Sequence, residues 1–288
     1  MQEMIYPGKY NTLKVVKKVD FGVYLDGDDR AEILLPKRYL PDTCEVDDEI
    51  AVFIYFDSED RIIATTEIPK VTVGECALLK VVDVTGQGAF VDWGLSKDLF
   101  VPIREQKEPM SQEKEYIVFA SYDVETDRIF GSTRLEYYLD NTTARYEEGD
   151  AVEVIIAEQT DLGYKAIIEN RHWGLLYRNE VFTPLHYGMQ TTCYVKKLRD
   201  DEKIDLSLQR SGYDRVTDVT DDILLKIKQA GGTINVSDSS SPETIQALFG
   251  ISKKTFKKAL GALYKNRLVV ISDNSIALTH KGKSKDVN

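Results

Sequence analysis

Short runs of alternating hydrophobic and polar residues dominate the chain up to about residue 210. The longest run spans residues 49–56, where two sets of residues alternate: Ile50, Val52, Ile54 and Phe56 against Glu49, Ala51, Phe53 and Tyr55. This alternation predicts a β-strand with one face on a core. The other runs are rich in Val, Ile, Tyr and Phe and end at Asp, Gly or Glu-Gly turns, which is typical of short strands.

The strand-like runs recur in three segments that follow one plan. The first comprises residues 13–19, 21–26, 31–36 and 57–63; the second, 78–84, 86–92, 99–102 and 127–131; the third, 152–156, 162–168, 174–177 and 202–208. The matching glycines are Gly22, Gly88 and Gly163, spaced 66 and then 75 residues apart. This period is too long for a solenoid unit and suits small domains. Five short strands per repeat predict a closed Greek-key barrel of the OB type, which leaves no sheet edge exposed.

After residue 212 the hydrophobic residues no longer alternate as in a strand and follow the spacing of a helix. Residues 218–230 have helical apolar spacing and end at a Gly-Gly pair, a typical C-cap. Ser241 followed by Pro242 predicts the start of a second helix, and Ser252 caps a third over 253–266. Residues 268–271 and 276–278 flank a polar turn and predict a hairpin. Three helices and a hairpin form the winged-helix plan, followed by a tail, 281–288, that we expect to fray.

We therefore expect a mainly β chain with a C-terminal α+β domain. The predicted domains are three tandem OB-fold barrels over residues 1–70, 71–140 and 141–212, and a winged helix over 213–288.

Composition narrows the class of protein. The chain has 288 residues, of which 42% are hydrophobic and 30% charged, as in folded globular proteins. Its apolar runs are far shorter than the roughly 20 residues of a membrane helix, and the N-terminal residues predict no signal peptide. Three scattered cysteines indicate a reducing compartment, hence the cytoplasm, and neither disulfides nor zinc. The net charge is −11, yet residues 213–288 are net basic, which indicates a localised surface for a polyanion.

The third predicted helix places its lysines on one side. Lys254, Lys257, Lys258 and Lys265 share that side with Gly261, and Lys253 and Arg267 flank it. The other side is apolar and should face the domain core: Phe256, Ala259, Leu260, Leu263 and Tyr264. The equivalent helix of helix-turn-helix folds meets nucleic acid, and lysines suit phosphate contacts, which make binding dependent on salt. The alternative is a merely solvated lysine face.

Two sets of motifs resemble known families. Residues 88–91 (Gly-Ala-Phe-Val), 21–24 and 203–207 resemble S1-type RNA-binding OB domains. Residues 241–265 are similar to the hallmark of the CvfB/YitL family of bacterial proteins, which carry three S1-type domains and a winged helix. That resemblance implies RNA binding and control of gene expression, including virulence genes in some bacteria, with no enzymatic activity and no cofactor.

The S1 resemblance also implies which residues bind RNA. S1-type domains hold single strands with aromatics that stack under bases and cations that hold phosphates. The positions that match are Phe21, Tyr24, Asp57 and Arg61 in the first repeat, Phe90 and Arg128 in the second, and Tyr177 and Lys203 in the third. Several positions depart from the pattern: Pro36, Gln87, Pro102, Leu162, Lys165 and Arg199. The departures increase along the chain, so we expect binding to concentrate on the first barrel and the winged helix.

The alternative for these residues is structural: aromatics that complete barrel cores and charges that are merely solvated. The basic residues at strand ends, Lys37, Arg38, Arg104 and Arg178, have the same two interpretations. The sequence has no P-loop and no HExxH motif, and His172, His186 and His280 lack the spacing of metal ligands. We therefore expect no catalytic residue and no metal.

The function predicted is a non-enzymatic, single-stranded-RNA-binding regulator of gene expression, with no membrane partner. One alternative is a DNA-binding transcription regulator that uses the winged helix. Another is a scaffold subunit of the RNA-decay or translation machinery, with RNA-processing or ribosomal proteins as partners. A ribonuclease is the remaining candidate.

Overall fold

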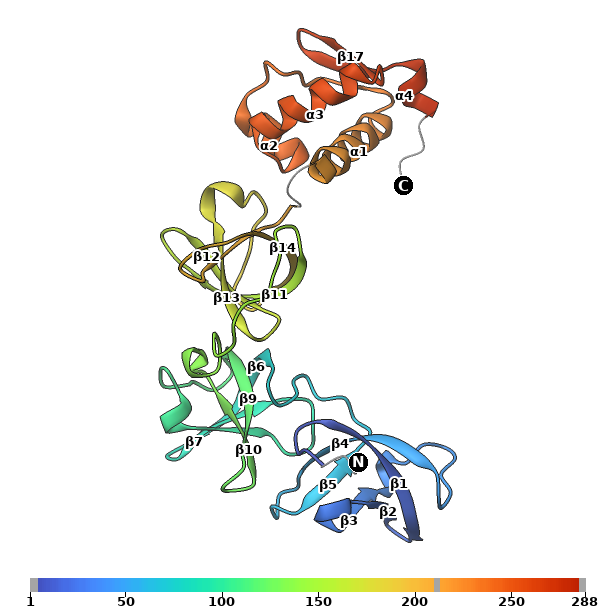
Figure 1. Cartoon of the computed structure of the whole chain (residues 1–288), viewed down its shortest axis with the longest axis vertical. Coiled ribbons are helices and arrows are strands. Elements are labelled where there is room, and N and C mark those ends of the chain that lie inside the picture. The colour runs from blue at the N-terminus through green and yellow to red at the C-terminus, as the bar shows by residue number, and fades with distance from the viewer. Residues whose placement is uncertain (1–4, 210–212, 285–288) are drawn as a thin grey trace. The chain divides into compact units, whose positions relative to one another are not determined.

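The computed structural model describes residues 5–209 and 213–284. The chain separates into two compact units, residues 1–142 and 143–288, and Figure 1 shows the order of the elements along it. Two OB-type sheets lie in the first unit; a third and the winged helix lie in the second. No helix among the described residues is long and apolar enough to cross a membrane.

Barrel 1 and barrel 3 are closed five-stranded barrels with the same strand order. Barrel 1 has the order β1-β2-β3-β5-β4, and barrel 3 has the order β11-β12-β13-β15-β14. The strands are β1 (Tyr10–Val19), β2 (Gly22–Asp26), β3 (Glu32–Pro36), β4 (Glu49–Phe56), β5 (Ile62–Thr65), β11 (Ala151–Gln159), β12 (Gly163–Ile168), β13 (His172–Tyr177), β14 (Gln190–Leu198) and β15 (Ile204–Ser207).

Barrel 2 repeats this plan with one difference. Its strands are β6 (Cys76–Thr85), β7 (Gly88–Asp92), β8 (Leu99–Pro102), β9 (Glu115–Asp123) and β10 (Arg128–Ser132). They form a sheet of order β10-β9-β6-β7-β8, with no hydrogen-bonded ladder between its end strands β8 and β10. The two strands still lie side by side: a Cβ on Gly131 would come within 2.9 Å of a Val101 methyl. Side chains thus close the barrel where the other two use hydrogen bonds.

The three glycines that align in the sequence have one structural role. Each lies where its strand passes close to the backbone of the next strand. A Cβ would come within 2.2 Å of the Leu35 carbonyl oxygen at Gly22, 2.4 Å of that of Val101 at Gly88, and 2.0 Å of that of Leu176 at Gly163. A larger residue would force the strands apart, so the glycine is required at this point of the barrel.

Strand β4 departs from the predicted pattern of one buried face. Residues Val52 to Tyr55 are all buried. The prediction was wrong for Phe53 and Tyr55, because the second face of β4 packs against barrel 2. Trp93 of barrel 2 lies edge-on to both rings, with centroids 5.8 Å from Phe53 and 6.4 Å from Tyr55. The two rings therefore belong to the hydrophobic core of barrel 2.

The winged helix has the predicted helices and hairpin with shifted ends. Its elements are α1 (Tyr213–Gln229), β16 (Thr233–Ile234), α2 (Pro242–Phe249), α3 (Lys253–Lys265), β17 (Val269–Ser272), β18 (Ser275–Leu278) and α4 (His280–Ser284). Helix α1 begins five residues earlier than predicted, and β16 adds a third strand to the hairpin. The predicted fraying is wrong for residues 281–284, which continue helix α4, while 285–288 lie outside the described residues.

Candidate nucleic-acid interface

Barrel 1 presents two aromatic rings, Phe21 and Tyr24, beside the cations Lys17 and Arg61. Phe21, in the turn between β1 and β2, is 58% exposed, and its ring centroid lies 6.4 Å from that of Tyr24 on β2. The Lys17 ammonium lies 4.5 Å from the Tyr24 centroid, a cation–π distance. Phe21 packs into no core, so the structural alternative for this residue does not hold.

Asp57 and Arg61 lie together at the tip of the β4–β5 turn. The Arg61 guanidinium donates from Nε and Nη2 to one Asp57 oxygen, at 2.9 and 2.8 Å. The other Asp57 oxygen accepts the backbone N–H groups of Glu59 and Arg61. Burial alone would raise the pKa of Asp57, but these hydrogen bonds outweigh it and lower the pKa. Asp57 thus shapes the turn and holds Arg61, whose side chain remains largely exposed.

Barrel 2 carries its aromatic pair in a groove. Phe90 on β7 and Phe100 on β8 are directly opposed in the sheet, with ring centroids 5.0 Å apart. Both line a groove of about 450 Å³, and Arg128 and Gln87 lie on its wall. The sequence interpretation missed Phe100, although its position two residues before Pro102 on a short strand was a usable signal.

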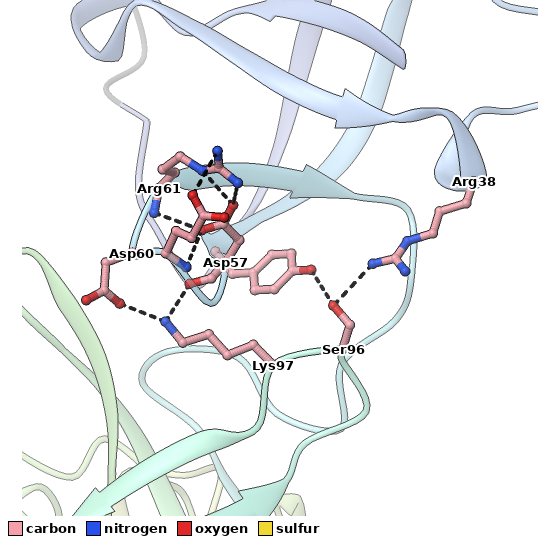
Figure 2. A network of polar contacts seen from close by, with 8 residues as sticks. Arg38, Asp57, Asp60, Arg61, Ser96 and Lys97 are labelled. Atoms are coloured by element: carbon pink, nitrogen blue, oxygen red, sulfur yellow. Dashed lines mark hydrogen bonds and ion pairs between the residues drawn. The ribbon is translucent and has the colours of Figure 1, made fainter. Parts of the chain in front are cut away.

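Residues of barrel 1 form part of the same groove. Asp60, in the β4–β5 turn, lines it and accepts hydrogen bonds from Lys97 at 2.8 Å and Arg128 at 3.4 Å. Figure 2 shows Lys97 also donating to the Asp57 carbonyl oxygen, at 2.6 Å. The cation predicted for phosphate binding in barrel 2, Arg128, is thus partnered by an acidic turn of barrel 1.

Three further contacts join barrels 1 and 2. Arg38, one of the strand-end cations, donates to Ser96 at 3.4 Å, and Ser96 also bonds the Tyr55 hydroxyl at 3.1 Å (Figure 2). Arg30 pairs with Asp127 at 2.9 Å. Arg38 therefore has a structural contact in addition to any role at a nucleic-acid face.

Barrel 3 does not bring its two predicted residues together. The parallel register of β13 and β15 pairs Gly174 with Ile204, so Lys203 is level with Trp173. Tyr177 lies about 13 Å further along the strand, at roughly 3.3 Å per residue. The Tyr177 ring has Lys196 near it at 5.8 Å, whereas Lys203 pairs with Asp201 at 3.0 Å. Lys165 departs from the S1 pattern, and its ammonium lies 3.8 Å from the centroid of the Trp173 ring.

Helix α3 has the lysine side that the sequence predicts. Ser252 caps its N-terminus by accepting from the Thr255 N–H. Phe256, Ala259, Leu260 and Leu263 are buried in the domain core. The opposite side is exposed and contains Lys254, Lys257, Lys258, Gly261 and Lys265, with Arg267 exposed just beyond the helix. Two lysines have partners at one end: Lys257 lies 4.0 Å from Asp238, and Lys253 donates to the Ser239 carbonyl oxygen at 3.4 Å.

The prediction for Tyr264 was wrong. We expected it on the core side of α3, but its side chain is 59% exposed. At 100° per residue Tyr264 falls on the border of the apolar side, next to the lysines. A long ring with a polar tip can remain in water there.

The cysteines and histidines form no site in the part of the chain that the structure describes. No group of His, Cys, Asp and Glu there could hold a metal ion. Cys76 and Cys193 are buried, and burial raises the pKa of each thiol to about 12. His172 is buried, and its Nδ1 lies 2.9 Å from the Tyr146 hydroxyl.

Comparison with family models agrees with this architecture. Residues 7–67 match the S1 domain family, and residues 221–278 match the CvfB-like winged helix domain. The Bacillus subtilis protein YitL is 30% identical over 274 residues, covering 90% of this chain and 89% of YitL. Conserved virulence factor B of Staphylococcus saprophyticus is 26% identical over 295 residues, covering 96% of this chain and 95% of that protein. A Streptococcus pneumoniae multidomain protein with nucleic acid binding domains aligns over 95% of this chain and 98% of its own, at 23% identity and a TM-score of 0.42.

OB-type S1 barrels joined to a winged helix define a class of multidomain nucleic-acid-binding proteins. Within that class, the similarity to YitL extends over nearly the whole length of both chains. The chain belongs to the CvfB/YitL family.

Proposed function

We propose that this protein binds single-stranded RNA in the bacterial cytoplasm and regulates gene expression after transcription, without chemistry of its own. The observation that carries the proposal is the pair of the exposed Phe21 and the half-buried Tyr24 on barrel 1, with Lys17 over the Tyr24 ring and Arg61 close enough to Tyr24 to interact electrostatically. Exposed aromatic rings next to cations suit unstacked bases joined by phosphates. A DNA duplex keeps its bases stacked inside and gives such rings nothing to stack on.

The winged helix supplies a second contact of a different kind. Within helix α3 the exposed lysines are not accompanied by Asn, Gln or Arg, the side chains that read base edges, so they suit the phosphate backbone. In this proposal barrel 1 stacks on bases, and α3 contacts the phosphate backbone of the RNA. The α3 contact raises affinity without sequence preference. The staphylococcal relative is named conserved virulence factor B, and this name supports extending the proposed regulation to virulence-type genes.

The experiment is a double substitution, Phe21→Ala with Tyr24→Ala, in the full chain. One stacked base is worth roughly 1–3 kcal/mol, so we expect the Kd for a single-stranded RNA to rise about tenfold or more. The control is Tyr6→Ala with Tyr137→Ala, which removes two exposed rings outside this face. Unchanged affinity in a folded Phe21/Tyr24 variant would remove barrel 1 as the site.

A further inference from the structure

The groove on barrel 2 contains more carboxylates than cations. Three carboxylates line it, those of Asp60, Asp98 and Asp127, against two cations, Lys97 and Arg128. Both cations are hydrogen-bonded to Asp60. A phosphate in this groove would meet more negative charge than positive, and no unpaired cation among its lining residues.

The floor of the groove suits the flat face of a nucleobase. Phe90 and Phe100 provide a tilted aromatic pair, and Phe56 and Ile129 extend the apolar lining. Stacking on such rings is favourable for any base. The aromatic floor and the acidic rim together therefore favour a base inside the groove, with the phosphates outside.

The carboxylates of the groove are not equivalent. Asp60 is held by Lys97 and Arg128, and Asp127 by Arg30 and Tyr122. Asp98 has no hydrogen-bond or ion-pair partner for its side chain within residues 5–209 and 213–284. It is half-buried, and burial together with the nearby Asp92 carboxylate raises its pKa. A carboxylate that is partly removed from water is stabilised by a ligand that supplies donors.

The four bases differ in the donors that they offer to a carboxylate. Guanine carries two adjacent donors, N1–H and the N2 amino group, which match the two oxygens of one carboxylate. Adenine and cytosine each place a single amino donor beside a ring-nitrogen acceptor. Uracil has one N–H between two carbonyl acceptors, which a carboxylate repels.

We propose that the groove between barrels 1 and 2 receives one unstacked guanine of a bound RNA, stacked on the floor formed by Phe90 and Phe100, with its Watson–Crick edge donating to Asp98. This inference rests on the proposed RNA binding and adds a base preference to it. Asp60 of the barrel 1 turn pairs with Lys97 and Arg128, and Asp98 sets the specificity.

The test measures fluorescence anisotropy of eight-nucleotide RNAs, all uridine except for one central guanosine, adenosine, cytidine or uridine. A bidentate contact discriminates bases by about tenfold or more, so we expect the guanosine oligonucleotide to bind at least about tenfold tighter than all-uridine. Asp98→Asn should reduce this ratio to within about threefold without weakening all-uridine binding. The matched control, Glu125→Gln, removes one negative charge from an exposed neighbouring turn outside the groove and should keep the ratio.

The outcomes separate the two proposals. Equal binding of all four RNAs by the wild-type chain, or a preference for another base, overturns the guanine site and leaves RNA binding in place. Retention of the guanine preference by Asp98→Asn overturns the role of Asp98. Absence of binding to every RNA overturns the proposed function and this inference together. The wild-type comparison depends on no variant, so a folding defect in Asp98→Asn does not remove the test.

Discussion

Barrels 1 and 2 are built from one strand plan, yet their aromatic faces differ in what surrounds them. In barrel 1 the Phe21 ring projects from a turn into solvent, and Arg61 is held by a carboxylate of its own turn. In barrel 2 the Phe90 ring packs on Phe100, and Arg128 is held by Asp60 of barrel 1. The Phe90–Phe100 contact lies between two strands of barrel 2, whereas the docking of barrel 1 brings Asp60 to Arg128. Repeats of similar sequence can thus present an open face in one copy and an enclosed groove in the next.

The largest expected effect comes from removing the ring on which this docking depends. Trp93 is 3% exposed, packs on Phe53 and Tyr55, and donates its indole N–H to the Lys97 carbonyl oxygen at 2.6 Å. Truncation of a buried Trp costs about 3–5 kcal/mol. We expect Trp93→Ala to lower the free energy of unfolding of residues 1–142 by that amount, measured by urea denaturation with far-UV circular dichroism.

Trp93→Phe is the control, since it keeps a ring in the contact and loses the hydrogen bond, and should cost far less. If Trp93→Ala left the urea midpoint within error of wild type, the two barrels would not stabilise each other.

A smaller effect separates the two aromatic faces directly. Phe90 is half-buried, so Phe90→Ala should lower the free energy of unfolding by about 1–3 kcal/mol, less than a fully buried Phe would. Phe21→Ala should change it by no more than about 0.5 kcal/mol, as is usual for exposed positions. Thermal denaturation of the two variants side by side measures the contrast. Equal losses at both positions would mean that the two faces are equally packed, against the structure.

The smallest effect concerns the Asp60 carboxylate of barrel 1, which pairs with Lys97 and Arg128 of barrel 2. The hydrogen bond from Lys97 lowers the pKa of Asp60 below its ordinary value. A lowered folded-state pKa contributes stability that is fully present above the unfolded value, about 3.9, and is lost as pH falls through the folded value. Because Asp60 is largely exposed, we expect less than about 1 kcal/mol.

Melting temperatures of wild type and Asp60→Asn, recorded from pH 7 to pH 3, measure this effect. The variant should lose less stability in acid than wild type does. Glu108→Gln, at an exposed carboxylate away from these contacts, should follow the wild-type curve. A wild-type curve parallel to that of Asp60→Asn would show that the pair adds no stability.

Local patterns in the sequence predicted the strands, the helices and the lysine side of α3, because each depends on neighbours a few residues apart. The matching glycines identified the repeats, because the close approach of strands at that point admits no side chain. The second buried face of β4, the groove and Asp60 beside Arg128 could not be predicted, since they arise where two barrels meet. Tyr264 was misplaced because its angle on the helix lies at the border between core and solvent. The domain boundaries and the RNA-contacting roles of the named residues remain predictions.

The central claim is that the chain recognises single-stranded RNA through base stacking as well as phosphate charge. Competition of unlabelled single-stranded RNA and duplex DNA of equal length against a labelled RNA, at physiological salt, tests it most directly. The account predicts that the single strand displaces the label at a concentration at least about tenfold lower than the duplex does, since only unstacked bases reach the barrel 1 rings. Displacement by duplex DNA at an equal or lower concentration would contradict it and favour a DNA-binding regulator that acts through the winged helix.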